Sequence, residues 1–252
     1  MAFSFAGATN DGIEYGVPAR VDFRRSASFG AGGRNCTFAL WVYPTTATFN
    51  QYLISKYDPS LSSGWAVRQG TTTNSTSISL LMDNIVFEWT DVLPDVNKWY
   101  HVVVRLTNKR LEAFKNGLPV LGFFLDISNS GIAAVVSKLT IGNRDAGSRA
   151  FAGRLERVAA WQRSLTDWEI YRLGSGAFPS EFAIGLVFDA PLRNDIVDSH
   201  GQNGVATNAT WIADPSIPTL KPRRHLDAKF LSKHMPVIDV LGAARRKDRI
   251  VI

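Results

Sequence analysis

Acidic residues that could act in pairs are scarce in this sequence. Hydrolysis of a glycosidic bond needs two carboxyl groups that flank the bond. Glu156, in "GRLERV", is followed by Arg157 and has no second acid within reach along its predicted strand. There is no defensible Ser/His/Asp set or dinucleotide fingerprint, and "FGAGGR" lacks the Lys-Ser/Thr that a phosphate-binding loop requires. We therefore predict a protein without catalytic residues.

Two loops carry oxygen ligands that could bind calcium. Asp195 and Asp198 lie in "NDIVDSHG", and Asn143 and Asp145 lie in "IGNRDAG". Calcium binds six to eight oxygen atoms, which converging carboxylates can supply. Asp and Asn also form turns by hydrogen-bonding their own backbone, and Arg144 disfavours a cation in the second loop. We expect turn formation, keep a structural calcium ion as the alternative, and assign no metal ligand or cofactor.

Histidine and tryptophan offer little more for chemistry. The four histidines are not spaced as metal ligands, and His101 sits in a predicted strand, where a hydrogen-bonded structural role is expected. A sugar-binding face would need exposed aromatic rings, but aromatic residues in alternating strands usually belong to the core. The candidates are Trp65, Trp89, Trp99 and Trp211. Of these we expect Trp89, in "IVFEWTD", to be the most exposed, and we assign no carbohydrate-binding residue.

The elements that position these residues are predicted to be short strands. "CTFALWVYP" and "WYHVVVRL" alternate with a period of two, and Pro44 ends the first of them. Asn116-Gly117 in "LEAFKNGLPVLGFF" predicts a tight hairpin, because both residues accept positive φ angles. Further strands are predicted at "YLISK", "WAVRQ", "SISLLM", "IVFEW", "KLTIG" and "RLERVAAW". Short strands separated by turns at intervals of about 8–12 residues indicate a two-sheet sandwich or a barrel.

One helix and one cysteine complete this outline. In "SLTDWEIYRLGSG", Thr166 is a suitable N-cap and Glu169 completes a capping box. Leu165 and Ile170 are placed to form a hydrophobic staple. Cys36 is the single cysteine and lies in an apolar run, so we expect a buried thiol and no disulfide within the chain. With 252 residues, of which 45% are hydrophobic, the chain can bury a sizeable core.

Four stretches of the chain occur in an order that is typical of one kind of domain. They are "FSFAGATNDGIEYG", "CTFALWVYP", "KWYHVVVRL" with "FKNGLPV", and "LTIGNR" with "FAGRLERVAAWQRSLTDWEI", and they are spread over roughly residues 2–173. They resemble laminin-G-like, concanavalin A-like jelly-roll domains. The resemblance implies a sandwich of two curved antiparallel sheets, with Trp41, Trp99 and Trp161 in the core. Hydrolases with this fold typically carry Glu-x-Asp-x-x-Glu on one strand, and that pattern is absent here.

A late segment resembles the part with which such domains normally begin. "GLVFDAPLRNDIVDSHGQNGVATNATW", residues 185–211, contains an apolar strand, a loop rich in Asp, Asn and Gly, and a final "G…T…W" pattern. In relatives this segment runs directly into the strand that corresponds to "FSFAG", which here comes first. We therefore predict a circularly permuted jelly roll in which Phe188 and Phe3 belong to one sandwich. The alternative is a domain-swapped strand that completes a neighbour's sheet.

The C-terminal segment carries the whole net charge of the chain. Residues 215–252 hold nine Lys or Arg against three Asp, whereas residues 1–214 hold nineteen of each sign. Such asymmetry is typical of an interaction arm. The short apolar runs "MPVIDVL" and "RIVI" would be unusual in a purely solvated tail. The prediction is an all-β jelly-roll domain with one short surface helix over residues 1–213, followed by a basic, Pro-containing arm over residues 214–252.

This arm is predicted to bind other proteins. The predicted partner-binding residues are Arg223, Arg224, Phe230, Val237, Ile238, Val240, Leu241, Arg245, Arg246, Lys247, Ile250 and Ile252. The arm could add a strand to an exposed sheet edge or place apolar side chains in a groove, and folding back on its own domain is the alternative. Nucleic acid is the rival partner for the basic clusters. Because Phe230 is the one aromatic residue available to stack on bases, we expect protein contact instead.

The composition of the whole chain suggests an assembly function. "MAFSFAGATN" has no basic lead-in and no long apolar segment, so we expect no cleaved signal peptide and no membrane span. Domains that resemble this one and lack a secretion signal occur in bacteriophage particles. By that resemblance we predict a non-enzymatic virion structural protein, in capsid decoration or the tail. It would be made in the host cytoplasm, form homo-oligomers, and bind copies of itself or other virion proteins.

One alternative function is a lectin-like carbohydrate-binding module for adhesion to a host or another surface. A glucanase-like hydrolase that depends on Glu156 is the other.

Overall fold

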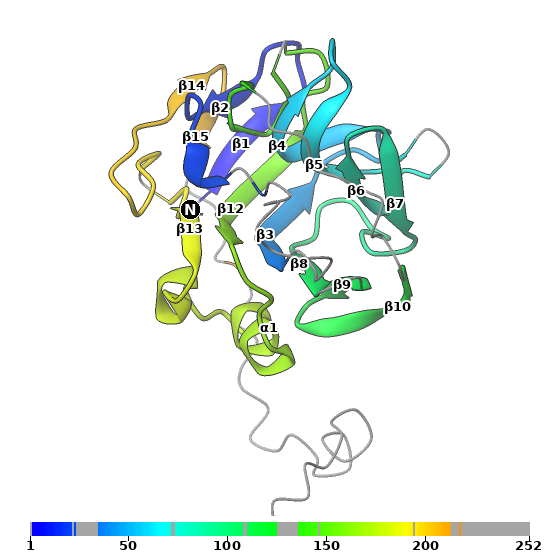
Figure 1. Cartoon of the computed structure of the whole chain (residues 1–252). Coiled ribbons are helices and arrows are strands. Elements are labelled where there is room, and N and C mark those ends of the chain that lie inside the picture. The colour runs from blue at the N-terminus through cyan, green and yellow to red at the C-terminus, as the bar shows by residue number, and fades with distance from the viewer. Residues whose placement is uncertain are drawn as a thin grey trace, which may run out of the picture. The chain divides into compact units, whose positions relative to one another are not determined.

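Two antiparallel sheets pack face to face (Figure 1). The computed structural model describes residues 2–21, 23, 35–71, 74–107, 110–124, 136–145, 147–193, 195–212 and 217. Within these residues the secondary structure is almost entirely β, with one α-helix. The predicted jelly-roll sandwich is confirmed. No helix in this described part of the chain is both long enough and apolar enough to span a membrane.

Eight strands form the first sheet, sheet A. Their order is β10-β9-β8-β3-β12-β1-β15, and β13 also pairs with β12. The strands are β1 (Ala2–Ala6), β3 (Cys36–Pro44), β8 (Tyr100–Thr107), β9 (Arg110–Lys115), β10 (Leu118–Phe124), β12 (Ala152–Trp161), β13 (Leu186–Ala190) and β15 (Thr210–Ile212).

Seven strands form the second sheet, sheet B, in the order β14-β2-β11-β4-β5-β6-β7. The strands are β2 (Gly12–Glu14), β4 (Gln51–Asp58), β5 (Ser63–Gln69), β6 (Ile78–Met82), β7 (Ile85–Trp89), β11 (Thr140–Ile141) and β14 (Val205–Thr207). Two short 3-10 helices, η1 (Ala19–Val21) and η2 (Pro179–Phe182), lie outside the sheets.

A single large apolar core fills the space between the sheets. Successive side chains of a strand point to opposite faces, so every second residue is directed inward. In β3 the inward residues are Phe38, Leu40 and Val42, as the period-two pattern predicted. Cys36 lies in the same row and its thiol is buried, as expected.

The predicted helix is present as α1 (Asp167–Gly174) and packs on the outer face of sheet A. The Glu169 backbone N–H donates to the Thr166 hydroxyl at 3.3 Å, and the Thr166 backbone N–H donates to the Glu169 carboxylate at 2.7 Å. The capping box is therefore confirmed. Leu165 and Ile170, the predicted staple, are both buried in a second apolar cluster beneath the helix.

The predicted Asn-Gly hairpin connects β9 to β10 and also supports this helix. Asn116 and Gly117 have φ angles of 52° and 79°, as a tight turn requires. A Cβ atom on Gly174 of α1 would lie 2.5 Å from the backbone nitrogen of Gly117. The hairpin and the helix can approach this closely because both contact residues are glycines.

β12 holds the beginning and the late part of the chain together in sheet A. One edge of β12 pairs with β3, while the other edge is shared. β1 pairs with residues 152–155 of β12, and β13 pairs with residues 158–161, both antiparallel. β13 and β1 thus follow one another along this edge, which is visible in Figure 1. The prediction that Phe188 and Phe3 belong to one sandwich is confirmed, and the late strand pairs with β12 of its own chain.

The late segment also reaches sheet B. After β13 the chain forms a loop and then the strands β14 and β15. β15 pairs with β1 in sheet A, whereas β14 pairs with β2 in sheet B. Polar contacts fix the intervening loop, because Arg20 of η1 forms an ion pair with Asp198 and its Nε donates to the Val187 carbonyl at 2.9 Å. Arg193 Nε lies 2.5 Å from the Glu156 carboxylate.

Replacing Phe188 tests whether this segment is an integral part of the fold. Its ring is fully buried and packs edge to face on Tyr15 with 5.0 Å between ring centroids. We expect Phe188→Ala to lower the free energy of unfolding by about 3–5 kcal/mol, measured by urea denaturation. Ile184→Ala, at a side chain that is 81% exposed, is the control and should change stability by less than about 0.5 kcal/mol. Equal, small effects would show that the segment contributes little to the core.

Asp189 of β13 makes the stability depend on pH. Burial, together with the charge of Asp198, raises the pKa of Asp189 from 3.8 to about 6. The folded chain therefore binds this proton more tightly than the unfolded chain, and stability is lost as the pH rises through 6. Relative to Asp189→Asn, the wild type should lose about 2–3 kcal/mol between pH 4 and pH 7. Urea denaturation across this pH range measures this loss of stability. The control is Asp195→Asn, which removes an exposed carboxyl group in the next loop. Identical pH profiles of wild type and Asp189→Asn would contradict it.

Candidate functional site

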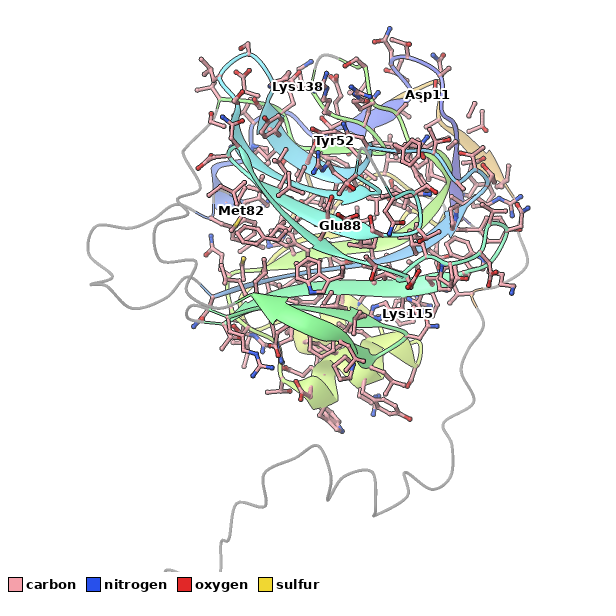
Figure 2. All side chains as sticks on the ribbon, turned by 90° about the vertical axis from the view of Figure 1, so that its right-hand side faces the viewer. Asp11, Tyr52, Met82, Glu88, Lys115 and Lys138 are labelled. Atoms are coloured by element: carbon pink, nitrogen blue, oxygen red, sulfur yellow. The ribbon has the colours of Figure 1, made fainter. Side chains whose placement is uncertain are left out.

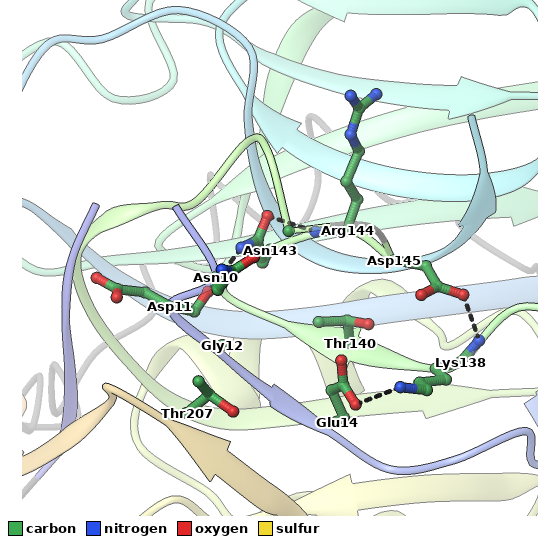
Figure 3. Close-up of a pocket in the computed structure, with 11 residues that line it drawn as sticks. Asn10, Asp11, Gly12, Glu14, Lys138, Thr140, Asn143, Arg144, Asp145 and Thr207 are labelled. Carbon is green, nitrogen blue, oxygen red and sulfur yellow. Dashed lines mark hydrogen bonds and ion pairs between the residues drawn. The ribbon is translucent and has the colours of Figure 1, made fainter. Parts of the chain in front are cut away.

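A polar pocket opens on the outer side of sheet B, where β2, β11 and β14 meet (Figure 3). Its volume is about 420 Å3. The residues that line it are Asn10, Asp11, Gly12, Glu14, Lys138, Thr140, Asn143, Arg144, Asp145, Gly147 and Thr207. They come from three parts of the chain that are far apart in sequence. Figure 2 shows Lys138 and Asp11 at the upper end of the sheet, above Tyr52 and Glu88.

Strand alternation places the floor of the pocket on this face. Ile13, Ile54 and Ile141 point into the core, so their neighbours point outward. Adjacent strands then align the outward residues in one row across the sheet. The row is Val205, Glu14, Thr140, Ser55, Ala66, Leu81 and Val86. Glu14 and Thr140 of this row line the pocket.

An ion pair lies at the side of this floor. Lys138 Nζ donates to Glu14 Oε2 at 2.7 Å, and the two side chains are 47% and 40% exposed. The hydrogen bond and charge of Glu14 raise the pKa of Lys138. The backbone N–H of Lys138 also donates to Asp145 Oδ2 at 3.3 Å. Lys138 thus contacts both carboxyl groups of this side, through its side chain and its backbone.

Asn143 joins the loop that follows β11 to the turn before β2. Its Nδ2 donates to the Asp11 carbonyl at 2.8 Å, while its Oδ1 accepts from the backbone N–H groups of Arg144 and Arg149. Ser55 Oγ donates to the Asn143 carbonyl at 2.9 Å, which anchors the loop on the sheet. The wall of the pocket is thus rigid, because each polar atom of Asn143 has a backbone or side-chain partner.

Two buried polar atoms of the pocket have no hydrogen-bond partner within the described residues. They are Oδ1 of Asp11 and Oγ1 of Thr140, and both residues are at least 98% buried. The other carboxylate oxygen of Asp11 accepts from the Ala8 backbone N–H at 3.0 Å. Figure 3 shows the Thr140 hydroxyl directed toward the side of the pocket where Asp145 and Lys138 lie. The Asp11 carboxylate is directed away from the other lining residues in the same view. An unpaired buried polar atom costs about 1–3 kcal/mol, so the Thr140 hydroxyl would gain from a hydrogen-bonding ligand or water.

The Arg144 side chain extends away from the pocket (Figure 3). Its Nε donates to the Ser148 hydroxyl at 3.0 Å, and its guanidinium group lies 5.7 Å from the centroid of the Tyr52 ring. The pocket is therefore a surface of hydroxyl, amide and carboxylate groups in which the Arg144 charge is directed away and the Lys138 charge is paired with Glu14. Such a surface can bind a polar, hydroxylated molecule through several hydrogen bonds.

The predicted partner-binding residues of the arm all lie outside the described residues. This applies to each of Arg223, Arg224, Phe230, Val237, Ile238, Val240, Leu241, Arg245, Arg246, Lys247, Ile250 and Ile252. Their role stays a prediction.

The four candidate calcium ligands divide between two kinds of contact. Asp198 accepts from the backbone N–H groups of His200 and Gln202 and pairs with Arg20, so it stabilises its own loop. Asp195 accepts from the Val197 backbone N–H at 2.9 Å. Asn143 and Asp145 line the pocket instead, and Asp195 and Asp198 do not. In the described part of the chain, no three His, Cys, Asp or Glu side chains form a group that could hold a metal ion.

The prediction for Trp89 is wrong. This side chain is 2% exposed, lies in the core, and donates from Nε1 to the Gly122 carbonyl of β10 at 3.3 Å. The open end of the sandwich is closed there by contacts between β7 and β10, which bury the ring. Trp65 is also fully buried, while Trp211 on β15 is 39% exposed.

The core assignments of the other tryptophans hold in part. Trp41 and Trp161 are buried, although both point to the outer face of sheet A. Trp99 is half-buried and packs against Tyr43, with 5.4 Å between ring centroids. It lies just before β8, where the sheet no longer covers it.

Glu156 and His101 occupy buried positions in sheet A. Burial raises the pKa of Glu156, and its carboxylate lies 2.5 Å from Arg193 Nε and 3.5 Å from Arg157 Nε. Burial and the charge of Arg157 lower the pKa of His101 to about 3, so the ring is neutral. Its backbone N–H donates to Asn116, but the ring Nδ1 has no partner, so the expected hydrogen-bonded role applies to the backbone alone.

Sequence reasoning missed most of this pocket. Asn143 and Asp145 were noticed as oxygen ligands, but Asp11, Glu14 and Thr140 were not. Glu14 and Thr140 are separated by 125 intervening residues and meet only as register partners of β2 and β11. The one local signal is that "NDGIEYG" and "KLTIGNRD" each combine a short strand with Asp, Asn and Gly.

A family model described as the concanavalin A-like lectin/glucanases superfamily matches residues 18–171. That range is more than half of the chain and contains β3 through most of α1.

Solved structures with a similar fold have low sequence identity to this chain. One is a candidate carbohydrate-binding protein from Bacteroides ovatus, with a TM-score of 0.60 and 16% identity. The similarity covers 83% of this chain and 60% of that protein. Another is a heptameric SAP-like pentraxin from Limulus polyphemus, with a TM-score of 0.55 and 14% identity over 82% of this chain and 91% of the pentraxin. At this identity the likeness shows the fold alone.

Thr140 and its register partner Ser55 on β4 provide a test of the unpaired state of Thr140. Thr140→Val removes a hydroxyl without a partner and keeps the side-chain shape, so stability should stay equal or rise by about 1 kcal/mol. Ser55→Ala removes a buried hydroxyl that donates to Asn143, and should cost about 1–2 kcal/mol. Urea denaturation of both variants gives the comparison. A larger loss for Thr140→Val than for Ser55→Ala would mean that the Thr140 hydroxyl has a partner in the folded chain.

Proposed function

We propose that this chain, which belongs to the concanavalin A-like lectin/glucanases superfamily, binds carbohydrate in the pocket on sheet B. The observation that carries the proposal is the unpaired, buried hydroxyl of Thr140 beside an open polar hollow. A sugar offers hydroxyl groups that both donate and accept hydrogen bonds, which suits this hydroxyl. Of the functions considered, this one is favoured over a role in virion assembly.

Access to the floor requires a small rearrangement. Thr140 is 2% exposed, and the Glu14–Lys138 ion pair lies beside it. Exposed ion pairs of this kind contribute about 0–1 kcal/mol, so a ligand can displace one partner at little cost. The ligand then gains hydrogen bonds to groups that have been removed from water. The pocket is large enough for a monosaccharide unit, because the volumes of small-ligand pockets begin at about 300 Å3.

The geometry favours binding over hydrolysis. A glycosidase needs an accessible pair of carboxyl groups about 5–10 Å apart, one on each side of the bond. Glu156, the one candidate noted in the sequence, is 1% exposed and is held by Arg193 and Arg157. It lies on sheet A, whereas the pocket lies on sheet B. We therefore propose a binding module without catalytic residues.

The comparisons support this choice through the fold. The Bacteroides ovatus protein that shares it is itself a candidate carbohydrate-binding protein. This chain spans 60% of the length of that protein, so any function of its remaining part is not transferred here. None of the similar structures reported above is a virion protein.

The order of the strands supports circular permutation as a separate proposal. β13 ends beside the start of β1 on the same edge of β12. A chain in which β13 led directly into β1 would therefore build the same sheet. The domain-swapped alternative would instead place β13 of one copy on β12 of another.

The C-terminal arm keeps assembly as a second candidate function. Its excess of positive charge and its apolar runs still favour a protein partner, either a copy of this chain or a virion protein. Under this proposal the chain would be a decoration or tail protein of a particle. Avidity from many repeated arms would compensate for weak single contacts.

A glycan array tests carbohydrate binding. We expect the wild type to bind at least one glycan, and Thr140→Val and Glu14→Ala each to lose about tenfold in affinity, which corresponds to about 1.4 kcal/mol. Thr210→Val, on the exposed strand β15, is the matched control and should bind as the wild type does. Binding that survives both pocket variants would place the sugar elsewhere. No binding to any glycan would end the proposal.

Native mass spectrometry tests the arm. The whole chain and a version that ends at residue 213 are compared at several concentrations. If the arm joins copies of this chain, oligomers should form with the whole chain and disappear from the shortened one. The same oligomers in the whole chain and in the shortened version would show that self-association does not depend on the arm.

A further inference from the structure

We infer that the pocket selects uncharged sugars and rejects sugars that carry a carboxylate or a sulfate. This inference rests on the proposed carbohydrate-binding function and adds the chemical class of the ligand. It follows from the charges that line the pocket and from the partners that those charges already have.

The lining carries more negative than positive charge. Asp11, Glu14 and Asp145 are acidic, whereas Lys138 and Arg144 are basic. An anionic group placed among these side chains would meet a net charge of the same sign. Like charges brought together in a partly desolvated site disfavour binding strongly.

Neither basic side chain is placed to receive an anion. Lys138 Nζ is 2.7 Å from Glu14 Oε2, so its charge is already balanced within the pocket. Arg144 donates to the Ser148 hydroxyl and lies over the Tyr52 ring, and Figure 3 shows its side chain directed away from the other lining residues. Proteins usually recognise a carboxylate or sulfate through a guanidinium fork or an ammonium group aimed at it. The described residues that line this pocket lack that arrangement.

The unpaired hydroxyl of Thr140 suits a neutral hydroxyl group on the ligand instead. Thr140 Oγ1 can donate one hydrogen bond and accept one. A sugar hydroxyl can donate to this group or accept from it, and brings no charge with it. A carboxylate on the ligand would supply acceptors alone.

Matched pairs of sugars test this selection directly. Oligomers of galactose and galacturonic acid, of glucose and glucuronic acid, and of mannose and mannuronic acid differ chiefly in whether C6 carries a hydroxyl or a carboxylate. Isothermal titration of the whole chain at pH 7.5, in a buffer that contains EDTA, measures each pair. The chelator is needed because a bound divalent cation would reverse the local charge. We expect the neutral member of at least one pair to bind at least about tenfold more tightly than its acidic partner.

Changing Glu14 shows whether charge is the cause. Glu14→Gln removes one negative charge from the lining and leaves Lys138 without its carboxylate partner. We expect this variant to narrow the preference for neutral sugars by about fivefold to tenfold, because the Lys138 ammonium group can then pair with the acidic ligand. Asp58→Asn removes the carboxylate of a half-buried residue at the end of β4, which does not line the pocket, and should leave the preference unchanged.

The outcomes separate this inference from the proposed function. Tighter binding of an acidic sugar that is lost in Thr140→Val would overturn the selection for neutral sugars and keep the pocket as a carbohydrate site. An unchanged preference in Glu14→Gln would also overturn it, because charge would then not be the cause. If no member of any pair and no glycan on the array binds, both the inference and the proposed function fail.

Discussion

The described fold depends on satisfying the backbone of β12 along both edges. β12 is ten residues long and lies inside sheet A, so unpaired N–H and C=O groups on either side would be costly. β3 pairs with one edge, and the other edge is filled by β1 and β13 in succession. At the junction, Arg157 adopts a φ of 51° and donates its N–H to the Pro191 carbonyl at 3.0 Å. The first strand and the late segment are thereby forced to lie next to each other.

The pocket is a consequence of that arrangement. β2 follows β1, and β14 follows β13, so the two strands reach sheet B side by side and pair there. Gly12 and Thr207 meet in this pairing, and Thr140 joins from β11 on the other side of β2. Other buried polar atoms without partners occur in the described chain, as at Asp189. Thr140 differs from it because its hydroxyl faces an open hollow.

Local interactions were read correctly from the sequence wherever they involve neighbours in the chain. The capping box of Thr166 and Glu169 and the turn at Asn116-Gly117 depend on residues one to three positions apart, so their patterns are visible in the letters. The strand patterns and the late strand around Phe188 were also predicted. Trp89 was not, because its burial depends on β10, which closes the end of the sandwich over it. The exposure of Trp99 likewise depends on where sheet A stops.

By itself, the sequence determined the all-β class, the places of the strands, and the absence of a paired-acid pattern along any one strand. Alternation of apolar residues is enough for this, because it records which face of each strand avoids water. The tertiary structure decided which outward-facing residues meet. Glu14, Thr140 and Thr207 form one surface only after the strand register of sheet B is set. Register is a relation between distant segments, so the chemistry of the pocket could not be read from any single stretch.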